Sequence, residues 1–457
     1  MTRQTSNSKK VFIKTFGCQM NEHDSAKMLL ILAGEGYLEA SAMEGADLIL
    51  FNTCTIREKA HHKAISEIGR AAQLKEQRPD IVIGVCGCVA QQEGAGLRKR
   101  YPLIDIIFGP DRIPALPELL ARVKCGGTAD ALELIDDRLN YRFMDEVPGE
   151  GRAPISAFVL AMKGCNCSCS YCIVPSVRGR EISRQADEIV EEVGALAHSG
   201  AREVTLLGQN VSAYRSGDGR RGEGLAGLIR RVSQETEIER IRFTSPHPLF
   251  INDELIGEFA DNGKLCPHIH LPVQAGADAV LKTMKRGYTR DLFMERSRRL
   301  RESRSGMSIT TDLIVGFPGE SERNFGDTLE MMRCVGFDSA FAFKYSPRPG
   351  TEAAESMCDD VPTEVKEERL SRLLELQRTM SRDRNEALVG SVGDVLVVGT
   401  DRMRKGLITG RRADNRIVHF AGNPSIIGDI VPVHVTGAND NSLNGELCHG
   451  GKKGQRS

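Results

Sequence analysis

Apolar and polar positions alternate along residues 9–124 in a pattern typical of short strands followed by amphipathic helices. Each apolar run ends in a turn of small or polar residues before the next helical stretch begins. Because parallel strands need such helical connections, the pattern predicts βαβ units and a parallel sheet. The expected strands are Val11–Phe16, Asp47–Phe51 and Ile81–Val85, and the expected helices are Ser25–Ala33, N-capped by Asp24, and Arg57–Gln77.

The same alternation continues over residues 154–388, where six apolar runs are separated by amphipathic helices. Six β/α units are fewer than the eight of a closed barrel, so the pattern predicts a partial (β/α)6 barrel in an α/β protein. The expected strands are Ile155–Ala161, Glu203–Leu207, Ile241–Thr244, His268–Val273, Ile309–Val315 and Ala340–Tyr345. The expected helices include Asp187–Ala197, Asp291–Arg304, Glu320–Val335 and the long charged segment Thr363–Leu388.

Two other segments differ from this pattern. Residues 125–153 are punctuated by glycine and proline with acidic residues between them, which predicts a linker. Residues 389–449 contain short strand-like runs broken by Gly, Asn and Asp, which predict a small OB-like β-barrel. Its expected strands are Asp394–Val398, Leu407–Gly410, Ile417–Phe420 and Ile430–Val435.

Composition narrows the class of protein. The chain has 457 residues, of which 40% are hydrophobic and 27% charged, with a formal net charge of -1. We find no secretory signal and no run of about 18 apolar residues, so we expect a cytoplasmic protein with no membrane span. In that reducing compartment the 13 cysteines, an odd number, are expected to be metal ligands or buried small side chains rather than disulfides.

Three of these cysteines, Cys165, Cys169 and Cys172, form a C-x3-C-x2-C motif after the first strand of the predicted barrel. Three thiolates on a cubane iron–sulfur cluster leave one iron open, which S-adenosylmethionine can chelate. An electron from the cluster can then break the sulfonium C–S bond and generate a radical. Barrel enzymes place their chemistry on loops such as this one. The alternative is a zinc site that includes Cys167, but four ligands within eight residues would be cramped.

A second set, Cys18, Cys54 and Cys88, follows the three strands expected in residues 9–124. The carboxyl ends of parallel strands meet at one edge of a sheet, so the three thiols are expected to converge there. They suit a second cluster with one open iron. Cys86 competes with Cys88 as the third ligand, and we favour Cys88 because Cys86 lies nearer the strand. The alternative is a set of unrelated buried cysteines.

Five strings of the sequence are characteristic of one known family. They are residues 15–24 (TFGCQMNEHD), 52–58 (NTCTIRE), 87–91 (GCVAQ), 270–274 (HLPVQ) and 341–351 (FAFKYSPRPGT). On these strings the chain resembles the methylthiotransferases, a family of radical S-adenosylmethionine enzymes, over nearly its full length. The resemblance is greatest to the branch that acts on tRNA. It implies a cluster-binding domain at 9–124, a radical core at 154–388 and an RNA-binding TRAM barrel at 389–449.

The resemblance implies a reaction as well: methylthiolation at C2 of N6-isopentenyl (dimethylallyl) adenosine next to the anticodon in tRNA. It also implies two 4Fe–4S clusters, S-adenosylmethionine in two roles, an electron donor such as flavodoxin or ferredoxin, and a monomeric enzyme. Tyr171 would pack near the adenine of S-adenosylmethionine, and Gln209, after the second barrel strand, would contact the same molecule. We predict no side-chain acid or base, because the cofactors carry the hard chemistry.

Three alternatives stay open at this point. Two are the same chemistry on threonylcarbamoyl-adenosine in tRNA or on an aspartate of a ribosomal protein. The third is a non-catalytic, metal-stabilised RNA-binding module. RNA contact is expected from a basic group on the C-terminal barrel, because OB-type barrels bind oligonucleotides and cations contact phosphates. Its members are Arg402, Arg404, Lys405, Arg411 and Arg412.

Overall fold

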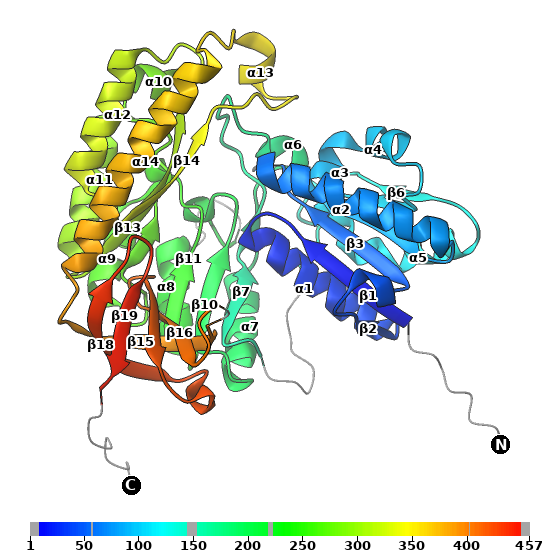
Figure 1. The fold of residues 1–457 in the computed structure, drawn as a ribbon, viewed down its shortest axis with the longest axis horizontal. Helices are drawn as coiled ribbons and strands as arrows, with labels where there is room; N and C mark the ends of the chain where they lie inside the picture. Colours follow the sequence, from blue (N-terminus) through cyan, green and yellow to red (C-terminus); the bar gives the residue numbers. More distant parts are fainter. Residues whose placement is uncertain (1–8, 56–57, 144–152, 218–222, 402, 449–457) are drawn as a thin grey trace.

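The computed structural model describes residues 9–55, 58–143, 153–217, 223–401 and 403–448. Figure 1 shows an N-terminal domain, blue to cyan, beside a central barrel, green to yellow, with a small C-terminal barrel, red, below it. The predicted order of domains is therefore present in the structure. No helix of the described residues is long and apolar enough to cross a membrane.

The N-terminal domain is a six-stranded parallel sheet in the order β2-β1-β3-β4-β5-β6. All three predicted strands are present, as β1 (Lys9–Thr15), β3 (Leu48–Thr53) and β4 (Val82–Gly87). Buried apolar side chains cover both faces of the sheet, as a doubly wound fold requires. The helices are α1 (Gln19–Gly34), α2 (Glu58–Gln77), α3 (Cys88–Glu93), α4 (Ala95–Arg100) and α5 (Leu116–Lys124).

Three strands of this sheet were not predicted. They are β2 (Tyr37–Glu39), β5 (Ile106–Phe108) and β6 (Ala129–Ala131), each three residues long. A run of three residues is too short to show an alternating pattern. Since β6 pairs with β5, the sheet extends into residues 125–153, where we expected a linker.

The predicted cap of the first helix is wrong. Helix α1 begins at Gln19 with Cys18 as its N-cap, so Asp24 lies inside the helix. The Asp24 side chain is buried and forms an ion pair with Arg178 of the central domain. We expected Asp24 to cap the helix because it is the polar residue just before the apolar run. The helix instead begins one turn earlier, at Gln19, in a mostly polar segment that the hydrophobic pattern does not mark.

The central domain has the predicted six-stranded partial barrel. Strands β7 (Ser156–Leu160), β10 (Glu203–Leu207) and β11 (Arg240–Phe243) form one parallel half, in the order β11-β10-β7. Strands β12 (His268–His270), β13 (Ser308–Val315) and β14 (Ser339–Lys344) form the other half in that order. An isolated parallel bridge between Ile241 and Leu265 joins the two halves, so β7 and β14 are the outer strands.

Helices cover the outside of this barrel and bury one continuous core. They are α7 (Ala186–His198), α8 (Leu225–Glu235), α9 (Asp253–Asp261), α10 (Asp278–Thr283), α11 (Arg290–Ser303), α12 (Glu322–Val335), α13 (Glu352–Ser356) and α14 (Thr363–Glu386). Helix α6 (Val174–Arg178) packs instead against the N-terminal domain. Strands β8 (Met162–Lys163) and β9 (Ile182–Ser183) form an additional antiparallel pair. Short 3-10 helices are η1 (Met43–Gly45), η2 (Pro110–Ala115), η3 (Val211–Ala213), η4 (Pro248–Phe250) and η5 (Pro424–Ile426).

The C-terminal domain is a closed five-stranded barrel in the order β15-β16-β17-β19-β18. The four predicted strands are β15 (Val392–Thr400), β16 (Leu407–Arg412), β17 (Ile417–Ala421) and β18 (Ile430–Ala438). The strand β19 (Leu443–Leu447), which was not predicted, pairs with β17 and β18 and closes the barrel. Its sequence LNGEL has too few apolar residues to predict a strand by itself.

The C-terminal barrel is tied to the central barrel by buried arginines of β11. Arg240 donates to the carbonyl oxygens of Arg411 and Asp394 at 2.8 and 3.0 Å. Arg242 donates to the carbonyl of Arg412 at 3.0 Å and to the buried carboxylate of Glu203 at 2.7 Å. These contacts join strand backbone of one domain to side chains of the other, which sets the orientation of the C-terminal barrel.

Candidate functional site

The first set of cysteines lies at the carboxyl ends of three neighbouring strands, as predicted. Cys18 follows β1 at the N-cap position of α1, Cys54 follows β3, and Cys88 follows β4 and begins α3. Cys18 and Cys54 share a hydrogen bond, which together with the nearby Arg178 lowers the pKa of the Cys18 thiol to about 6. A thiol with that pKa is largely a thiolate near neutral pH, the form that binds metals.

A glycine allows these cysteines to approach each other. Gly17 has a φ of +118°, and a side-chain Cβ at this position would lie 2.8 Å from Cys54 Sγ and overlap the Cys54 Cβ. The two turns are also joined by buried amides. Asn21 donates to Asn52 Oδ1 and to the carbonyl of Thr53, both at 2.9 Å, and Asn52 donates to the carbonyl of Asn21 at 2.8 Å. Sequence reasoning did not identify these asparagines, although each lies within three residues of a cysteine.

Cys86 and Cys88 point to different places. The Cys86 side chain is buried in the sheet, with its Sγ 3.7 Å from Met28 Sδ and 3.5 Å from the carbonyl oxygen of Phe51. Cys88 instead packs against Ile173 and Val177, at the boundary with the central domain. This placement favours Cys88 over Cys86 as the third ligand of the first set.

The second set lies on the loop between β8 and α6. Arg286 donates to Cys169 Sγ at 3.4 Å and to the Tyr171 hydroxyl at 3.3 Å, so one buried cation contacts both the cysteine and the tyrosine of the motif. Its other contacts, to Tyr288 and to the carbonyl of Pro272, hold it on the barrel. Sequence reasoning did not single out Arg286, because nothing near it in the sequence indicates its contact with a loop more than a hundred residues away.

The two residues expected to contact S-adenosylmethionine lie close to this loop. The Tyr171 ring makes an edge contact with Phe317, with centroids 6.3 Å apart. Gln209 accepts a hydrogen bond from the backbone N–H of Gly164, immediately before Cys165. In this arrangement Gln209 supports the cysteine loop, and its contact with S-adenosylmethionine stays a prediction.

Cys167 is also placed by the loop. Its Sγ lies 3.6 Å from Asn210 Nδ2, and its backbone N–H donates to Cys165 Sγ at 3.4 Å. Within the described residues no three histidine, cysteine or carboxylate side chains are gathered closely enough for a single metal ion. A cubane cluster does not need such a gathering, because each cysteine binds a different iron. Each cysteine set has a buried arginine beside it, Arg178 at the first set and Arg286 at the second. Three thiols with a nearby positive charge fit an anionic iron–sulfur cluster at each site.

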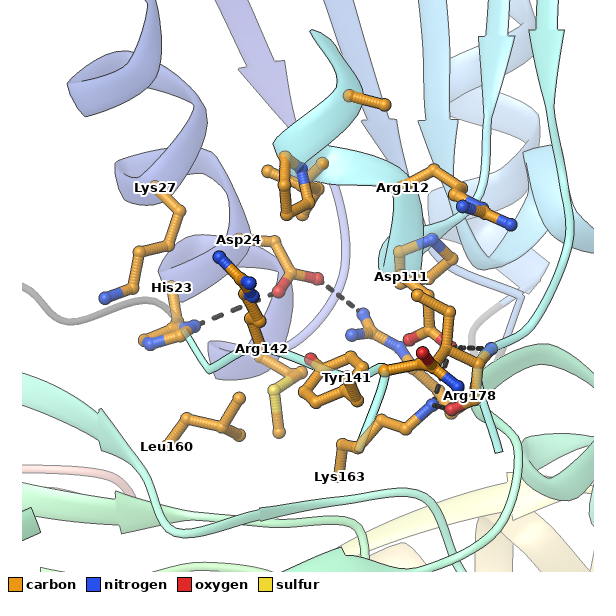
Figure 2. A pocket seen from close by; sticks show the side chains of 17 residues that line it. His23, Asp24, Lys27, Asp111, Arg112, Tyr141, Arg142, Leu160, Lys163 and Arg178 are labelled. Carbon is orange, nitrogen blue, oxygen red and sulfur yellow. Dashed lines mark hydrogen bonds and ion pairs between the residues drawn. The ribbon is translucent and has the colours of Figure 1, made fainter. Parts of the chain in front are cut away.

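The two sets of cysteines are joined by helix α6. This helix begins two residues after Cys172, packs on Cys88 through Val177, and ends at Arg178. Arg178 donates to Asp24 Oδ2 of α1 at 2.7 Å. Figure 2 shows this pair beside Lys163, which forms an ion pair with Asp111 at 2.5 Å. The surrounding cavity, of about 180 Å³, lies between the N-terminal domain and the barrel.

A larger cavity, of about 590 Å³, reaches from Cys18 and Cys54 into the barrel and to the C-terminal domain. Alternate residues of β13 and β14 line it, as expected for side chains that face the inside of a barrel. Most of its lining is polar or charged. The exceptions on β14 are Phe341 and Phe343, which are 50% and 37% exposed. The cavity therefore combines thiols, polar groups and an aromatic wall.

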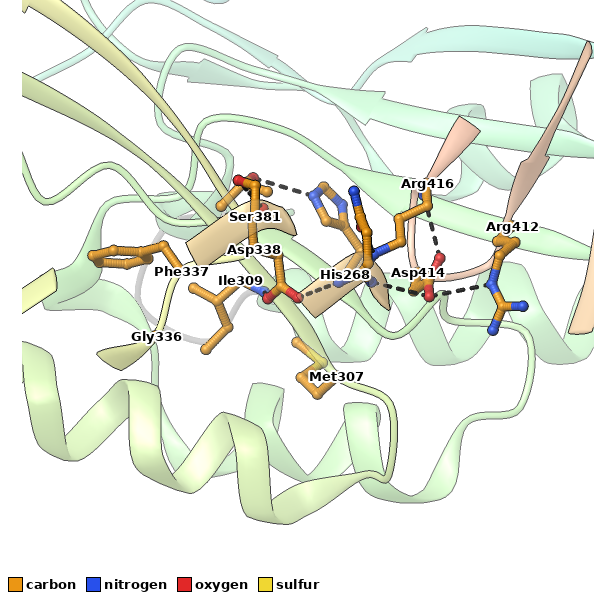
Figure 3. A network of polar contacts seen from close by, with 12 residues as sticks. His268, Met307, Ile309, Gly336, Phe337, Asp338, Ser381, Arg412, Asp414 and Arg416 are labelled. Carbon is orange, nitrogen blue, oxygen red and sulfur yellow. Dashed lines mark hydrogen bonds and ion pairs between the residues drawn. The ribbon is translucent and has the colours of Figure 1, made fainter. Parts of the chain in front are cut away.

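Figure 3 shows the polar corner of this cavity, where β12, β13 and the C-terminal barrel meet. Arg416 binds Asp338 at 2.5 Å and Asp414 at 3.1 Å, and so joins the two barrels. His268 lies 3.2 Å from the Thr310 hydroxyl. Burial, with the positive charge of Arg242, holds the pKa of His268 well below its usual range, so this ring is neutral and serves as a hydrogen-bonding group. Arg416 was not among the predicted site residues.

The predicted RNA-binding residues fall into separate groups. Arg404 and Lys405 are exposed in the turn between β15 and β16, while Arg402 lies outside the described residues. Arg411 forms an ion pair with the buried Glu203 at 3.4 Å, and Arg412 binds Asp414 at 3.3 Å. Arg411 therefore contributes to docking of the C-terminal barrel, while the Arg412 side chain pairs within that barrel. Arg404 and Lys405 are the exposed members of the predicted group.

Comparison with known proteins gives a match for each domain. Residues 10–109 match the Uncharacterized protein family UPF0004, residues 159–332 match the Radical SAM superfamily, and residues 386–448 match the TRAM domain. Among solved structures, the chain is similar to a radical S-adenosylmethionine methyltransferase, TsrM, from Kitasatospora setae, with cobalamin and a 4Fe–4S cluster bound. The TM-score is 0.53 at 16% identity, over 76% of this chain and 77% of that one, which shows likeness of fold alone.

Curated relatives match the whole chain. One from Alkalilimnicola ehrlichii, named tRNA-2-methylthio-N(6)-dimethylallyladenosine synthase, is 47% identical over 443 residues, which is 96% of this chain and 97% of the relative. Relatives of the same name from Methylococcus capsulatus and Trichlorobacter lovleyi are 45% and 46% identical, and each match covers 96% of this chain. These two matches cover 95% and 100% of the relatives themselves. The similarity therefore spans all three domains.

Proposed function

The chain belongs to the tRNA-2-methylthio-N(6)-dimethylallyladenosine synthase family of radical S-adenosylmethionine enzymes, and on this basis we propose the reaction that it catalyses. It adds a methylthio group to C2 of N6-dimethylallyladenosine next to the anticodon of tRNA. The observation that carries this proposal is the joining of two cysteine sets by α6, with a cavity that extends from one set into the barrel.

Each cysteine set has its own role in this proposal. As a radical S-adenosylmethionine enzyme the chain uses a 4Fe–4S cluster and S-adenosylmethionine, and Cys165, Cys169 and Cys172 are the proposed ligands. Cys18, Cys54 and Cys88 are the proposed ligands of a second 4Fe–4S cluster. When bound, the first cluster would supply the electron that splits S-adenosylmethionine, and the second would hold the sulfur that enters the product.

The side chains of the protein position the reactants. C2 of adenine carries an unactivated C–H bond, so the radical must form where only this carbon is within reach. The contact between Tyr171 and Arg286 holds the loop of Cys165, Cys169 and Cys172 against the barrel. Helix α6 sets the spacing between this loop and the first cysteine set. Phe341 and Phe343 form the aromatic wall against which the dimethylallyl group packs, since exposed apolar side chains in a polar cavity favour an apolar ligand group.

The C-terminal barrel is proposed to bind the RNA. Arg404 and Lys405 are exposed, and Arg404 lies beside Asn439–Ser442. Cations at such positions can contact backbone phosphates. The modified base must leave its stack in the anticodon loop to enter the cavity. We further propose that a protein such as flavodoxin or ferredoxin donates the electrons, and that the enzyme is a cytoplasmic monomer.

Nucleoside mass spectrometry tests the reaction. Reconstituted enzyme is incubated anaerobically with a reductant, S-adenosylmethionine and tRNA that carries dimethylallyladenosine. The expected product is 2-methylthio-N6-dimethylallyladenosine. If 5′-deoxyadenosine forms without that product, the radical assignment stands, and threonylcarbamoyl-adenosine in tRNA and the ribosomal aspartate become the substrates to test.

A further inference from the structure

A buried ion pair lies between the two cysteine sets. Arg178, at the end of α6, and Asp24, inside α1, come from different domains, and both side chains are more than nine-tenths buried. Their atoms Nη2 and Oδ2 are 2.7 Å apart (Figure 2). The neighbouring Val177 packs on Cys88, and the positive charge of Arg178 acts on the Cys88 and Cys18 thiols. The pair therefore places one positive and one negative charge beside the first cysteine set.

The cavity around this pair is also lined by Lys163, Lys27, His23 and Arg142. Lys163 is neutralised by Asp111, with which it forms a contact of 2.5 Å. Lys27 is paired with Glu192 at 3.8 Å. The ring of His23 lies on the far side of Asp24, 3.9 Å from its Oδ1. An arginine side chain stays protonated in any protein environment, so the charge of Arg178 is permanent.

Buried charges act strongly on an iron–sulfur cluster. A cluster held by thiolates is anionic, and reduction adds a further negative charge to it. A cation at its side stabilises the reduced form and raises the reduction potential, while an anion does the opposite. Since both side chains are more than nine-tenths buried, solvent screens these effects less than it would at the surface.

We propose that Arg178 and Asp24 are positioning residues that set the reduction potential of the cluster at Cys18, Cys54 and Cys88, Arg178 raising it and Asp24 lowering it. The inference rests on the proposed function, because it requires a second cluster at these cysteines. Arg178 lies six residues after Cys172 on the helix that packs against Cys88. The loop that holds the radical cluster thereby also supplies the charge that tunes the second cluster.

The test uses the full-length chain with Cys165, Cys169 and Cys172 all changed to alanine, so that one cluster alone is observed. Its potential is measured by redox titration followed by electron paramagnetic resonance, with iron and sulfide counted in every sample. Arg178→Gln should lower the potential and Asp24→Asn should raise it. Each change corresponds to about a tenfold shift in the reduced-to-oxidised ratio at fixed applied potential.

Three further variants separate charge from structure. Arg178→Lys keeps the charge and should leave the potential close to that of the parent chain. The double variant Asp24→Asn with Arg178→Gln removes both charges and should fall between the two single variants. Arg180→Gln removes an exposed charge from the same segment and should have no effect.

Two results would overturn the inference in distinguishable ways. In the first, the cluster is retained, but the two single variants shift its potential in the same direction or no further than Arg180→Gln does. The pair then does not tune the cluster, and the proposed function is unaffected. If the parent chain with three alanines binds no iron and sulfide on reconstitution, the second cluster itself is wrong, and the inference fails with it.

Discussion

Single residues determine how each cysteine set is held in place. Cys18 can approach Cys54 because Gly17 has no side chain. The position of the loop that carries Cys165, Cys169 and Cys172 depends on Arg286, which contacts Cys169 and Tyr171. Neither residue binds a cofactor in our assignment. Each is needed because a ligand set must be held in place by its surroundings.

The division of work between the cysteine sets is the first prediction. Replacing Cys165, Cys169 or Cys172 with alanine should abolish 5′-deoxyadenosine formation, because the radical cluster loses a ligand. Replacing Cys18, Cys54 or Cys88 should leave that formation intact and abolish methylthio product. Product analysis by liquid chromatography and mass spectrometry measures both. Cys167→Ala is the matched control inside the motif and should keep both activities; equal losses in the two sets would contradict the division.

The second prediction concerns Gly17. Gly17→Ala should displace Cys54, since the new Cβ would overlap it, and the positive φ adds strain for any residue with a side chain. The variant should retain the iron and sulfide of one cluster and still form 5′-deoxyadenosine. Gly36→Ala is the control, because Gly36 also has a positive φ but no atom lies near its Cβ position. A Gly17→Ala variant with the iron content of the parent protein would show that the close approach is not required.

At the scale of elements, the outer strand β14 gives the cavity its apolar wall. Its alternate residues Phe341 and Phe343 face the cavity, and the ring of Phe341 makes an edge contact with His270, with centroids 6.0 Å apart. An outer strand has one free side, which leaves room for a ligand beside it. The apolar surface that β14 presents, rather than any polar contact, would then favour binding of the dimethylallyl group.

The third prediction follows from this wall. Phe341→Ala and Phe343→Ala should each weaken binding of an anticodon stem-loop with dimethylallyladenosine about tenfold, because less apolar area is buried against the group. Binding of the same stem-loop with unmodified adenosine should not change. Fluorescence anisotropy of labelled RNA measures both, and Leu38→Ala, at a 56% exposed position on β2, is the control. Equal weakening for both RNAs would place the dimethylallyl group elsewhere.

At the scale of the whole molecule, the cavity exists because three domains meet. Cys18 and Cys54 line it from the N-terminal domain, β11 to β14 from the barrel, and Arg416 from the C-terminal domain. The buried carboxylate of Glu203 accepts from Arg242 and also pairs with Arg411 of the C-terminal barrel. These contacts keep the C-terminal domain at a defined place beside the cavity, where an RNA bound to it would present its loop.

The fourth prediction tests the RNA surface. The double variant Arg404→Ala with Lys405→Ala should bind the anticodon stem-loop more weakly, and the slope of log affinity against log salt should fall by about one to two units. The loss should be the same for RNA with or without dimethylallyladenosine, because phosphate contacts carry no base information. Arg298→Ala on α11, which removes an exposed arginine paired with Glu302, is the control. An unchanged salt slope would exclude the turn between β15 and β16 as a phosphate contact.

The fifth prediction concerns the docking of the C-terminal barrel. Arg242→Ala leaves the Glu203 carboxylate buried with one arginine fewer, which should cost about 3 kcal/mol in the stability of this interface. Hydrogen exchange should therefore become faster in β15 and β16 while the core of the N-terminal sheet is unaffected. Exchange that rises equally in all three domains would indicate general destabilisation instead of undocking.

The sequence alone determined the features that depend on neighbouring residues. Hydrophobic alternation and turn residues predicted the six barrel strands, three strands of the first sheet and four of the C-terminal barrel. The placement of Cys18, Cys54 and Cys88 at one edge of the sheet was predicted as well, because each follows a strand whose direction the pattern reveals. Strands β2, β5, β6, β8, β9 and β19 were missed because short or polar runs form strands only when a partner strand supplies their hydrogen bonds.

Only the tertiary structure decided the roles that depend on distant partners. Asp24 was expected to cap a helix, yet it pairs with a residue 154 positions away in the sequence. Arg411 was expected on an RNA surface, yet its side chain pairs with the buried Glu203 of the central barrel. The same charged side chain can cap, bind phosphate or form a buried ion pair. Which of these it does depends on the groups that folding brings within reach and on how far water is excluded there.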